Sequence, residues 1–372
     1  MTKKDQAQKL LLPAGIDINK DMRIHDERTF DRVFREGSLG LGEAYMDGWW
    51  DCDQLDGFFY RVLRYGLDKK FFSIWPYLLQ TAMSLVFNQQ SGKRAFEVGE
   101  RHYDTGNDLF QPMLGRSMAY SCGYWSSPFG EAKNLDEAQE AKFDLICRKL
   151  GLKPGMTFLD IGCGWGSLVK YAVQKYRVKA TGITVSEKQA EFAKDFCKEL
   201  PVPVEIKFMD YRCLDRKFDR IASVGMIEHV GYRNYREYMR TACRSLNDGG
   251  LFLLHTIGSD TSVTSTDPWI EKYIFPNSHL PSLKQLMAAA EGMFVTEDLH
   301  NFGADYDKTL MAWHDNFEKA WPRLKGDYSE RFRRMWRYYL LSCAGMFRAR
   351  KGQLWQIVFS KNGVPGGWSP VR

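Results

Sequence analysis

The sequence predicts an α/β fold in which helices cover both faces of a mostly parallel sheet. From Leu135 onward, apolar runs of strand length alternate with segments of helical periodicity, as they do in doubly wound sheets. Residues 158–166 (FLDIGCGWG) form an apolar run that ends in an acid and three alternating glycines, which is typical of a strand leading into a ligand-binding turn. Residues 1–90 are helical and aromatic and contain no such turn. We therefore predict a small domain over 1–90 and a larger one over 91–372.

The elements of the larger domain follow in order. Asn134 is a good N-cap for a helix that Gly151 ends, and the strand around Phe158 comes next. The six further predicted strands span 180–185, 204–209, 220–224, 251–255, 294–299 and 355–359. Helices are expected over 187–200 and 234–246 and between 308 and 350, with a turn over 247–250 and a flexible tail over 362–372. The sheet therefore has seven strands.

Composition narrows the classes of protein. The 372 residues are 44% hydrophobic, which is ample for a large core, and the net charge of +6 only weakly favours an anionic lipid surface or nucleic acid. The eight cysteines form no C-x-x-C pair and have no zinc-ligand spacing with histidine, so we expect reduced thiols in a cytosolic protein and no metal. No run of 18 apolar residues occurs, so the protein is expected to be soluble or peripherally attached to a membrane.

The glycine segment predicts the ligand. Gly162 and Gly164 allow the backbone to approach a ligand closely, and Asp160 can accept hydrogen bonds from its polar end. The spacing is G-x-G-x-G rather than G-x-G-x-x-G, and the second strand ends without an acid, both of which count against a nicotinamide cofactor. The segment resembles the first motif of S-adenosylmethionine (SAM) methyltransferases. Asp210-Tyr211 could hold an adenine or simply cap a helix.

Three other segments carry candidate chemistry. The rings of 120–125 (YSCGYW) are interleaved with Ser, Cys and Gly, which favours a pocket for a cationic group over plain core packing. Glu228 follows the fourth strand and His255 ends the fifth, so both are placed for acid–base work at one edge of the sheet. A solvated loop acid and a structural histidine are the alternatives.

The chain resembles the cyclopropane fatty acid synthase and mycolic acid methyltransferase family over nearly its whole length. The resemblance is carried by residues 36–50, 102–110, 120–122, 159–166, 226–231, 253–258, 267–277 and 301–307. It implies a Rossmann-like SAM-dependent methyltransferase fold with an additional N-terminal domain. The match over 36–50 (EGSLGLGEAYMDGWW) matters most, because the related mycolic acid methyltransferases generally lack that domain.

The resemblance also implies a reaction and its residues. Such enzymes add a methylene group from SAM across the cis double bond of an acyl chain in a membrane phospholipid, through a carbocation that bound bicarbonate deprotonates. The positions matching the bicarbonate site are Cys122, Glu228, His255, the backbone of Ile257, and Tyr306. The positions matching the SAM site are Tyr120, Ser121, Asp160, Gly162, Cys163, Gly164, Thr184, Gln189 and Tyr211.

Partners follow from the same resemblance. We expect a phospholipid bilayer with cis-unsaturated chains, a homodimer, no nucleic acid, and a cytoplasmic protein attached peripherally to the inner face of the membrane. Two basic–aromatic segments, around Lys69–Trp75 and Arg331–Tyr338, are candidates for the membrane surface, with packing or a dimer contact as the alternative. Methylation to a branched lipid, a small-molecule N-methyltransferase and a non-catalytic lipid- or SAM-binding protein remain alternative functions.

Overall fold

A computed structural model describes residues 1–67, 106–127 and 130–372. The chain divides into two compact units. The first combines residues 1–67 with Thr264–Ser278 and Tyr306–Gly352, and the second combines the described residues from 106 to 263 with His279–Asp305 and Gln353–Arg372. The boundary expected near residue 91 lies outside the described residues, so the functional division at that point stays a prediction.

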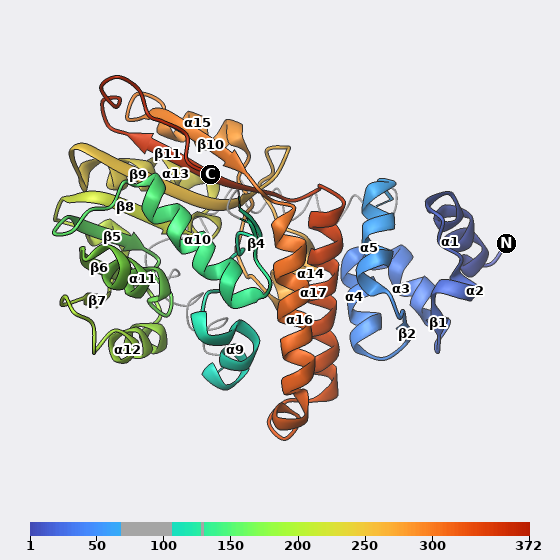
Figure 1. The fold of residues 1–372 in the computed structure, drawn as a ribbon. Coiled ribbons are helices and arrows are strands. Elements are labelled where there is room, and N and C mark those ends of the chain that lie inside the picture. The colour runs from blue at the N-terminus through green and yellow to red at the C-terminus, as the bar shows by residue number, and fades with distance from the viewer. Residues whose placement is uncertain (68–105, 128–129) are drawn as a thin grey trace. The chain divides into compact units, whose positions relative to one another are not determined.

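The second unit is built on a seven-stranded sheet with the order β10-β11-β9-β8-β5-β6-β7 (Figure 1). The neighbours from β9 to β7 pair in parallel, whereas β11 runs antiparallel to both β9 and β10. The predicted mostly parallel sheet is therefore confirmed. The strands are β5 (Thr157–Ile161), β6 (Lys179–Thr184), β7 (Glu205–Phe208), β8 (Phe218–Val224), β9 (Leu246–Gly258), β10 (Val295–Asn301) and β11 (Gln353–Ser360).

Helices cover both faces of this sheet. Successive residues of a strand point to opposite faces, and in β5 Phe158 belongs to one apolar cluster while Leu159 belongs to another. Residues of α10, α11 and α12 pack in the first cluster, and residues of α13 and α15 pack in the second. The helices of the unit are α9 (Asn107–Leu114), α10 (Leu135–Lys149), α11 (Ser167–Tyr176), α12 (Glu187–Phe196), α13 (Tyr235–Arg244) and α15 (Leu283–Ala290), with 3₁₀ turns η2 (Gly115–Ser117), η3 (Tyr211–Cys213), η4 (Ile227–His229) and η5 (Tyr232–Asn234) and a small ribbon of β3 (Ser126–Ser127) and β4 (Gly130–Glu131).

Local signals placed some elements well and others poorly. Asn134 caps α10 as predicted, since its side chain accepts a hydrogen bond from the Glu137 amide at 3.0 Å. The turn expected over 247–250 lies instead inside β9. Phe218 pairs with Leu246 and Arg220 with Leu251, so the four residues form an irregularity within the strand.

The C-terminal tail also differs from the expectation of a flexible segment. Arg372 forms an ion pair with Asp298 at 2.7 Å, and the Val364 amide donates to Glu297 at 2.9 Å. Trp368 packs against the apolar cluster that contains Phe158. These contacts tie the tail to the sheet unit.

The first unit consists mainly of helices. A buried carboxylate, Glu43, accepts hydrogen bonds from Lys272 at 2.6 Å and Tyr273 at 2.7 Å and also pairs with Arg32. These bonds tie the N-terminal segment to the segment 264–278. The elements are α1 (Lys3–Leu11), η1 (Leu12–Ala14), α2 (Ile18–Asp21), β1 (Arg23–Ile24), α3 (Arg28–Glu36), α4 (Ser38–Met46), β2 (Trp50–Asp51), α5 (Leu55–Arg64), α14 (Pro268–Tyr273), α16 (Asp305–Leu324) and α17 (Glu330–Arg348).

The basic–aromatic segment of α17 is part of this packing. Trp336 and Tyr338 are buried, and Arg331 and Arg334 form ion pairs with Asp47 and Asp51 at 2.9 and 2.7 Å. Arg333 and Arg337 both pair with Glu318. The packing alternative therefore describes this segment, and it is not a surface of free basic and aromatic side chains.

The other segment, around Lys69–Trp75, lies outside the described residues. Among the helices that are described, none combines the length and the apolar character needed to cross a bilayer.

Candidate functional site

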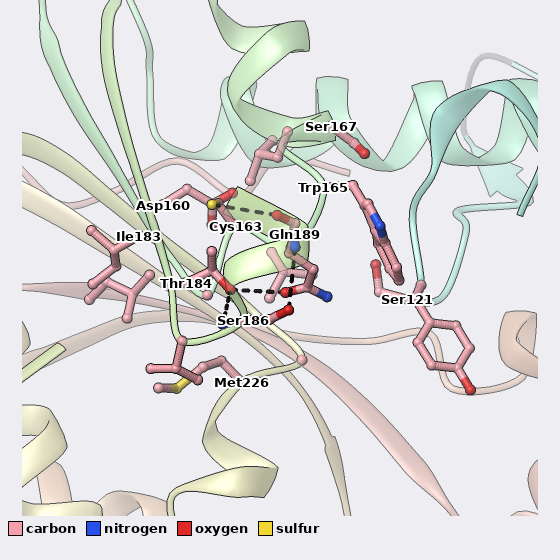
Figure 2. A pocket seen from close by; sticks show the side chains of 18 of the residues that line it. Ser121, Asp160, Cys163, Trp165, Ser167, Ile183, Thr184, Ser186, Gln189 and Met226 are labelled. Carbon is pink, nitrogen blue, oxygen red and sulfur yellow. Dashed lines mark hydrogen bonds between the residues drawn. The ribbon is translucent and has the colours of Figure 1, made fainter. Parts of the chain in front are cut away.

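A pocket opens at the carboxyl ends of β5, β6 and β8 (Figure 2). Ligands bind at this edge of open α/β sheets because the loops that follow the strands converge there. All nine residues predicted to hold SAM line this one pocket: Tyr120, Ser121, Asp160, Gly162, Cys163, Gly164, Thr184, Gln189 and Tyr211. The structure thus brings them together, and their role in binding stays a prediction.

The glycine turn after β5 forms the floor of this pocket. Gly162 has φ 83° and Gly164 has φ 53°, both in the left-handed region that favours glycine. A Cβ atom at Gly162 would lie 2.7 Å from the Cγ atom of Met226. The amides of Gly162 and Cys163 both donate to the Ile183 carbonyl at 2.9 Å, which anchors the turn to β6.

The residues after β6 form a closed network. The Thr184 hydroxyl donates to the side-chain oxygen of Gln189 at 2.9 Å and accepts from the Ser186 amide at 3.2 Å. Ser186 caps α12 by accepting from the Gln189 amide at 3.3 Å (Figure 2). These bonds hold both predicted ribose-binding side chains at the pocket wall.

The two residues expected to meet an adenine divide between the alternatives. The Asp210 side chain caps η3, since it accepts from the Arg212 amide at 2.9 Å, and it forms an ion pair with that residue's guanidinium at 2.7 Å. Asp210 therefore serves as a cap, whereas the buried Tyr211 ring lines the pocket.

Two buried charged side chains also line the pocket. Burial raises the pKa of Asp160 to about 7, and its Oδ1 atom finds no hydrogen-bond partner among the described residues. Lys142 projects from α10, and its Nζ atom donates to the Ser121 hydroxyl at 2.8 Å. Burial lowers the pKa of Lys142 to about 7 because it disfavours the charged form.

Sequence reasoning missed Lys142. A signal was present, because Lys142 lies four residues after Ala138 and three before Leu145, on the same face of the helix as both. A lysine on the apolar face of a buried helix is unusual.

A second polar cluster lies at the ends of β8 and β9. Glu228 lies in η4 after β8, and its Oε1 atom accepts from the Ile257 amide at 2.8 Å. The Oε2 atom is buried and has no partner in the described part of the chain. Burial raises the pKa of this carboxyl to about 7, so the neutral, proton-donating form is accessible near neutral pH. Glu228 is a buried carboxyl and not a solvated loop acid.

His255 belongs to the same cluster. It pairs with Val224 across β8 and β9 and is 1% exposed. The side-chain nitrogen of Gln356 donates to Nδ1 at 3.2 Å, which places the ring proton on Nε2. Burial, with the charge of Lys142 added, holds the pKa of His255 well below its usual value. The ring is therefore neutral, and within the described residues its Nε2 atom has no partner.

Gln356 was also missed by sequence reasoning. It is a fully buried amide inside the apolar run of β11, and that interruption of an apolar strand was the available signal.

The remaining two predicted residues are Cys122 and Tyr306. Cys122 is fully buried. Its thiol interacts electrostatically with Lys142, and the charge of Lys142 in turn lowers the pKa of His255. Tyr306 lies in α16 and belongs to the other unit, where its ring centre is 4.5 Å from that of Phe347. The structure therefore joins Glu228 to the Ile257 amide, places His255 two residues before Ile257 in β9, and describes Tyr306 only within its own unit. That these residues and Cys122 form one site stays a prediction.

The aromatic segment 120–125 has a mixed role. Tyr120 lines the pocket. Tyr124 is buried with its ring centre 5.2 Å from that of Phe302, whose ring also lies 5.7 Å from that of His255. The Trp125 amide donates to Asp305 at 2.7 Å. Tyr120 therefore helps to form the pocket, whereas Tyr124 packs against another ring.

Comparison with known proteins identifies the family. Residues 90–357 match the family model described as mycolic acid cyclopropane synthetase. The chain is 53% identical over 370 residues to cyclopropane-fatty-acyl-phospholipid synthase of Escherichia coli (strain K12), covering 98% of this chain and 95% of that protein.

Two solved structures agree. The cyclopropane synthase MmaA2 from Mycobacterium tuberculosis has a TM-score of 0.66 and 29% identity, and mycolic acid cyclopropane synthase CmaA1 complexed with SAH and CTAB has a TM-score of 0.66 and 32% identity. Each comparison covers 72% of this chain and 98% of the other. The predicted fold and the resemblance noted from the motifs are confirmed, and the chain belongs to the mycolic acid cyclopropane synthetase family.

Proposed function

We propose that this protein is a SAM-dependent enzyme that adds a methylene group to the cis double bond of an acyl chain in a membrane phospholipid, forming a cyclopropane ring. The observation that carries the proposal is the similarity to the Escherichia coli synthase, which spans 98% of this chain. It therefore includes the N-terminal residues that the family model, over 90–357, leaves out. Membership of the family alone supports a lipid-modifying methyltransferase, and the N-terminal similarity supports a phospholipid substrate.

The pocket residues fit SAM. The turn at Gly162 and Gly164 leaves space where side chains would otherwise stand, and the buried Oδ1 atom of Asp160 lacks a partner in the described residues. We assign Tyr211 to the adenine, Thr184 and Gln189 to the ribose, and Tyr120, Ser121 and Asp160 to the amino-acid end. The remaining predicted residues, Gly162, Cys163 and Gly164, would meet the ligand with their backbone.

The second cluster fits a small anion. A protonated Glu228 can donate from Oε2 while the Ile257 amide holds Oε1, and the neutral His255 ring can donate from Nε2. We propose that this anion is bicarbonate, also held by Cys122 and Tyr306. Cys122 would then act as an anion-pocket residue without a covalent intermediate.

The proposed reaction requires both a methyl donor and a base. When bound, SAM supplies an electrophilic methyl group and bicarbonate supplies a base. Transfer to one alkene carbon would break the bond between that methyl carbon and the sulfonium sulfur, release S-adenosylhomocysteine and leave positive charge on the other alkene carbon. A proton of the new methyl group would then pass to the base, and the electron pair of that C–H bond would close the ring. The protein's own residues exclude water and orient the two groups. Glu228 and His255, both buried, would hold the base with their hydrogen bonds.

Two further proposals concern the membrane and the oligomeric state. A lipid within a bilayer requires that the protein reach the membrane surface, so we propose peripheral association with the cytoplasmic face of the membrane. A homodimer involving the N-terminal residues is proposed on the family resemblance.

The function is tested by incubating the purified protein with SAM and vesicles of cis-unsaturated phospholipid and analysing the released fatty acids by mass spectrometry. A gain of one CH₂ with the double bond converted to a ring is expected. The same gain as a methyl branch would instead favour the branched-lipid alternative, and a saturated phospholipid is the matched negative control. Absence of any gain, with SAM still bound, would contradict the proposal and turn attention to small amines.

A further inference from the structure

Two lysines on α10, Lys142 and Lys149, are both 1% exposed. They lie seven residues apart, close to two helical turns, and so on the same side of the helix. Lys149 has partners within the fold, because its Nζ atom lies 3.6 Å from an Asp298 carboxylate oxygen and 3.1 Å from His300 Nδ1. Lys142 donates to the Ser121 hydroxyl, and the described residues offer it no ion pair. Lys149 thus has a carboxylate at ion-pair distance, whereas Lys142 interacts with the Asp160 carboxyl only at longer range in the described part of the chain.

The charged residues around Lys142 indicate which kind of ligand group it can bind. The acidic and basic residues that line the pocket are Lys142, Asp160, Asp210, Arg212 and His229, and burial lowers the pKa of His229 to about 4, so its ring is uncharged. Asp210 and Arg212 neutralise each other through their ion pair at 2.7 Å. The remaining charges are one buried ammonium and one buried carboxylate, and the carboxylate has an unpartnered oxygen as far as the structure describes the chain.

This pair complements one part of the proposed ligand. The adenosine part of SAM carries no carboxylate and no ammonium, whereas its amino-acid end carries one of each. We propose that Lys142 binds the carboxylate of that amino-acid end, together with the Ser121 hydroxyl that it orients, while Asp160 receives the ammonium group. This inference rests on the proposed function in that the ligand is SAM.

The hydrogen bond to Ser121 explains how two donors reach one carboxylate. An ammonium group has three hydrogens and uses one of them on the Ser121 oxygen. Because that oxygen already accepts, the hydroxyl hydrogen is free to point toward the ligand. Gln139 secures this segment, since its side-chain nitrogen donates to the Ser121 carbonyl at 2.8 Å.

The energetics agree with the geometry. A buried ammonium that forms no ion pair is costly, and burial lowers the pKa of Lys142 to about 7 although the more distant Asp160 carboxyl acts in the opposite direction. A bound carboxylate would supply the compensating charge.

The test measures binding of S-adenosylhomocysteine and of its decarboxylated analogue by calorimetry, with the full-length wild type and Lys142→Met. We expect the substitution to weaken binding of S-adenosylhomocysteine about 10- to 100-fold, the scale of a lost charge-assisted hydrogen bond. Binding of the decarboxylated analogue should change less than about twofold, because the group that Lys142 contacts is missing. Lys149→Met is the matched control and should leave both affinities unchanged.

The outcomes separate the inference from the proposed function. Failure of the wild type to bind S-adenosylhomocysteine would contradict the proposed function itself. Equal weakening of both ligands in Lys142→Met, or no weakening of either, would overturn the role assigned to Lys142. Lys142→Gln provides a second variant that keeps a donor without the charge. If neither variant folds, the wild type still provides a test. Binding of the decarboxylated analogue as tight as that of S-adenosylhomocysteine would overturn the inference.

Discussion

The two polar sites at the carboxyl edge of the sheet differ in how completely their hydrogen bonds are satisfied. After β6, Thr184, Ser186 and Gln189 bond to one another in a closed network. After β8 and at the end of β9, Glu228 and His255 each bond to the protein through one atom and keep a second atom without a partner in the described chain. A closed network fixes a shape, whereas a half-satisfied pair is ready to bind or exchange protons with another group.

The difference extends to charge. Thr184 and Gln189 do not titrate, so the wall that they form keeps the same charge across the physiological pH range. Burial instead raises the pKa of Glu228 to about 7 and holds that of His255 well below its usual range. Displaced pKa values are characteristic of groups that handle protons. We therefore expect substitutions in the half-satisfied cluster to affect turnover and substitutions in the closed network to affect affinity.

The largest effect is expected for Glu228→Gln. The amide keeps the shape but cannot exchange a proton, so turnover on lipid should fall about 10²-fold or more. Affinity for S-adenosylhomocysteine should stay near the wild-type value, because Glu228 belongs to the other site. Turnover on phospholipid vesicles and calorimetric binding measure the two, with the exposed Glu291→Gln as control. Unchanged turnover would show that Glu228 takes no part in the chemistry.

Depletion of bicarbonate should also slow the reaction. We expect the rate to fall at least about 10-fold in carbonate-free buffer and to recover when bicarbonate is added back, since the proposed base is exogenous. The measurement is the initial rate against bicarbonate concentration, with chloride at equal ionic strength as control. A rate that does not respond would mean that a side chain accepts the proton.

Gln356→Leu tests how the His255 ring is held. Without the hydrogen bond to Nδ1 at 3.2 Å, the proton is no longer confined to Nε2, and turnover should fall about 10-fold. The nitrogen chemical shifts of His255 should report the change of tautomer while affinity for S-adenosylhomocysteine stays constant. Gln353→Leu, in the same strand and bonded to Asn301, is the control. An unchanged tautomer would contradict a positioning role.

The smallest effect is expected in the closed network. Gln189→Ala removes one hydrogen bond to the proposed ribose position and one to Thr184, which should weaken S-adenosylhomocysteine binding about 5-fold. Turnover at saturating SAM should stay near wild type. Glu187→Ala, at an exposed position of the same helix, controls for helix stability. A fall in saturated turnover with unchanged binding would show that the two sites do not divide as we propose.

Much of the fold was predictable because its signals are local. The cap at Asn134, the strand β5 and the glycine turn that follows it depend on residues next to one another in the chain. Errors arose where distant segments decide the outcome. The residues 247–250 look like a turn, yet β8 pairs on either side of them and keeps them within β9. The tail is held by Asp298 and Glu297 of β10, which its own sequence does not indicate.

The site divides in the same way. The motifs indicated Asp160, Glu228 and His255, because each lies at or just after the end of an apolar run that predicts a strand. Gln356 escaped notice, because its role depends on β11 lying beside β9. No local pattern predicts that β11 lies antiparallel between β9 and β10.

The sequence by itself determined the alternation of strands and helices, the glycine turn and the family, since each follows from short patterns of adjacent residues. Only the tertiary structure decided the different roles of Lys142 and Lys149, which the helical pattern treats alike. Strand β10 brings Asp298 to Lys149, whereas Lys142 meets Ser121 at the pocket. The physical reason is that the energy of a buried charge depends on partners that are distant in the chain, and only folding brings those partners into contact.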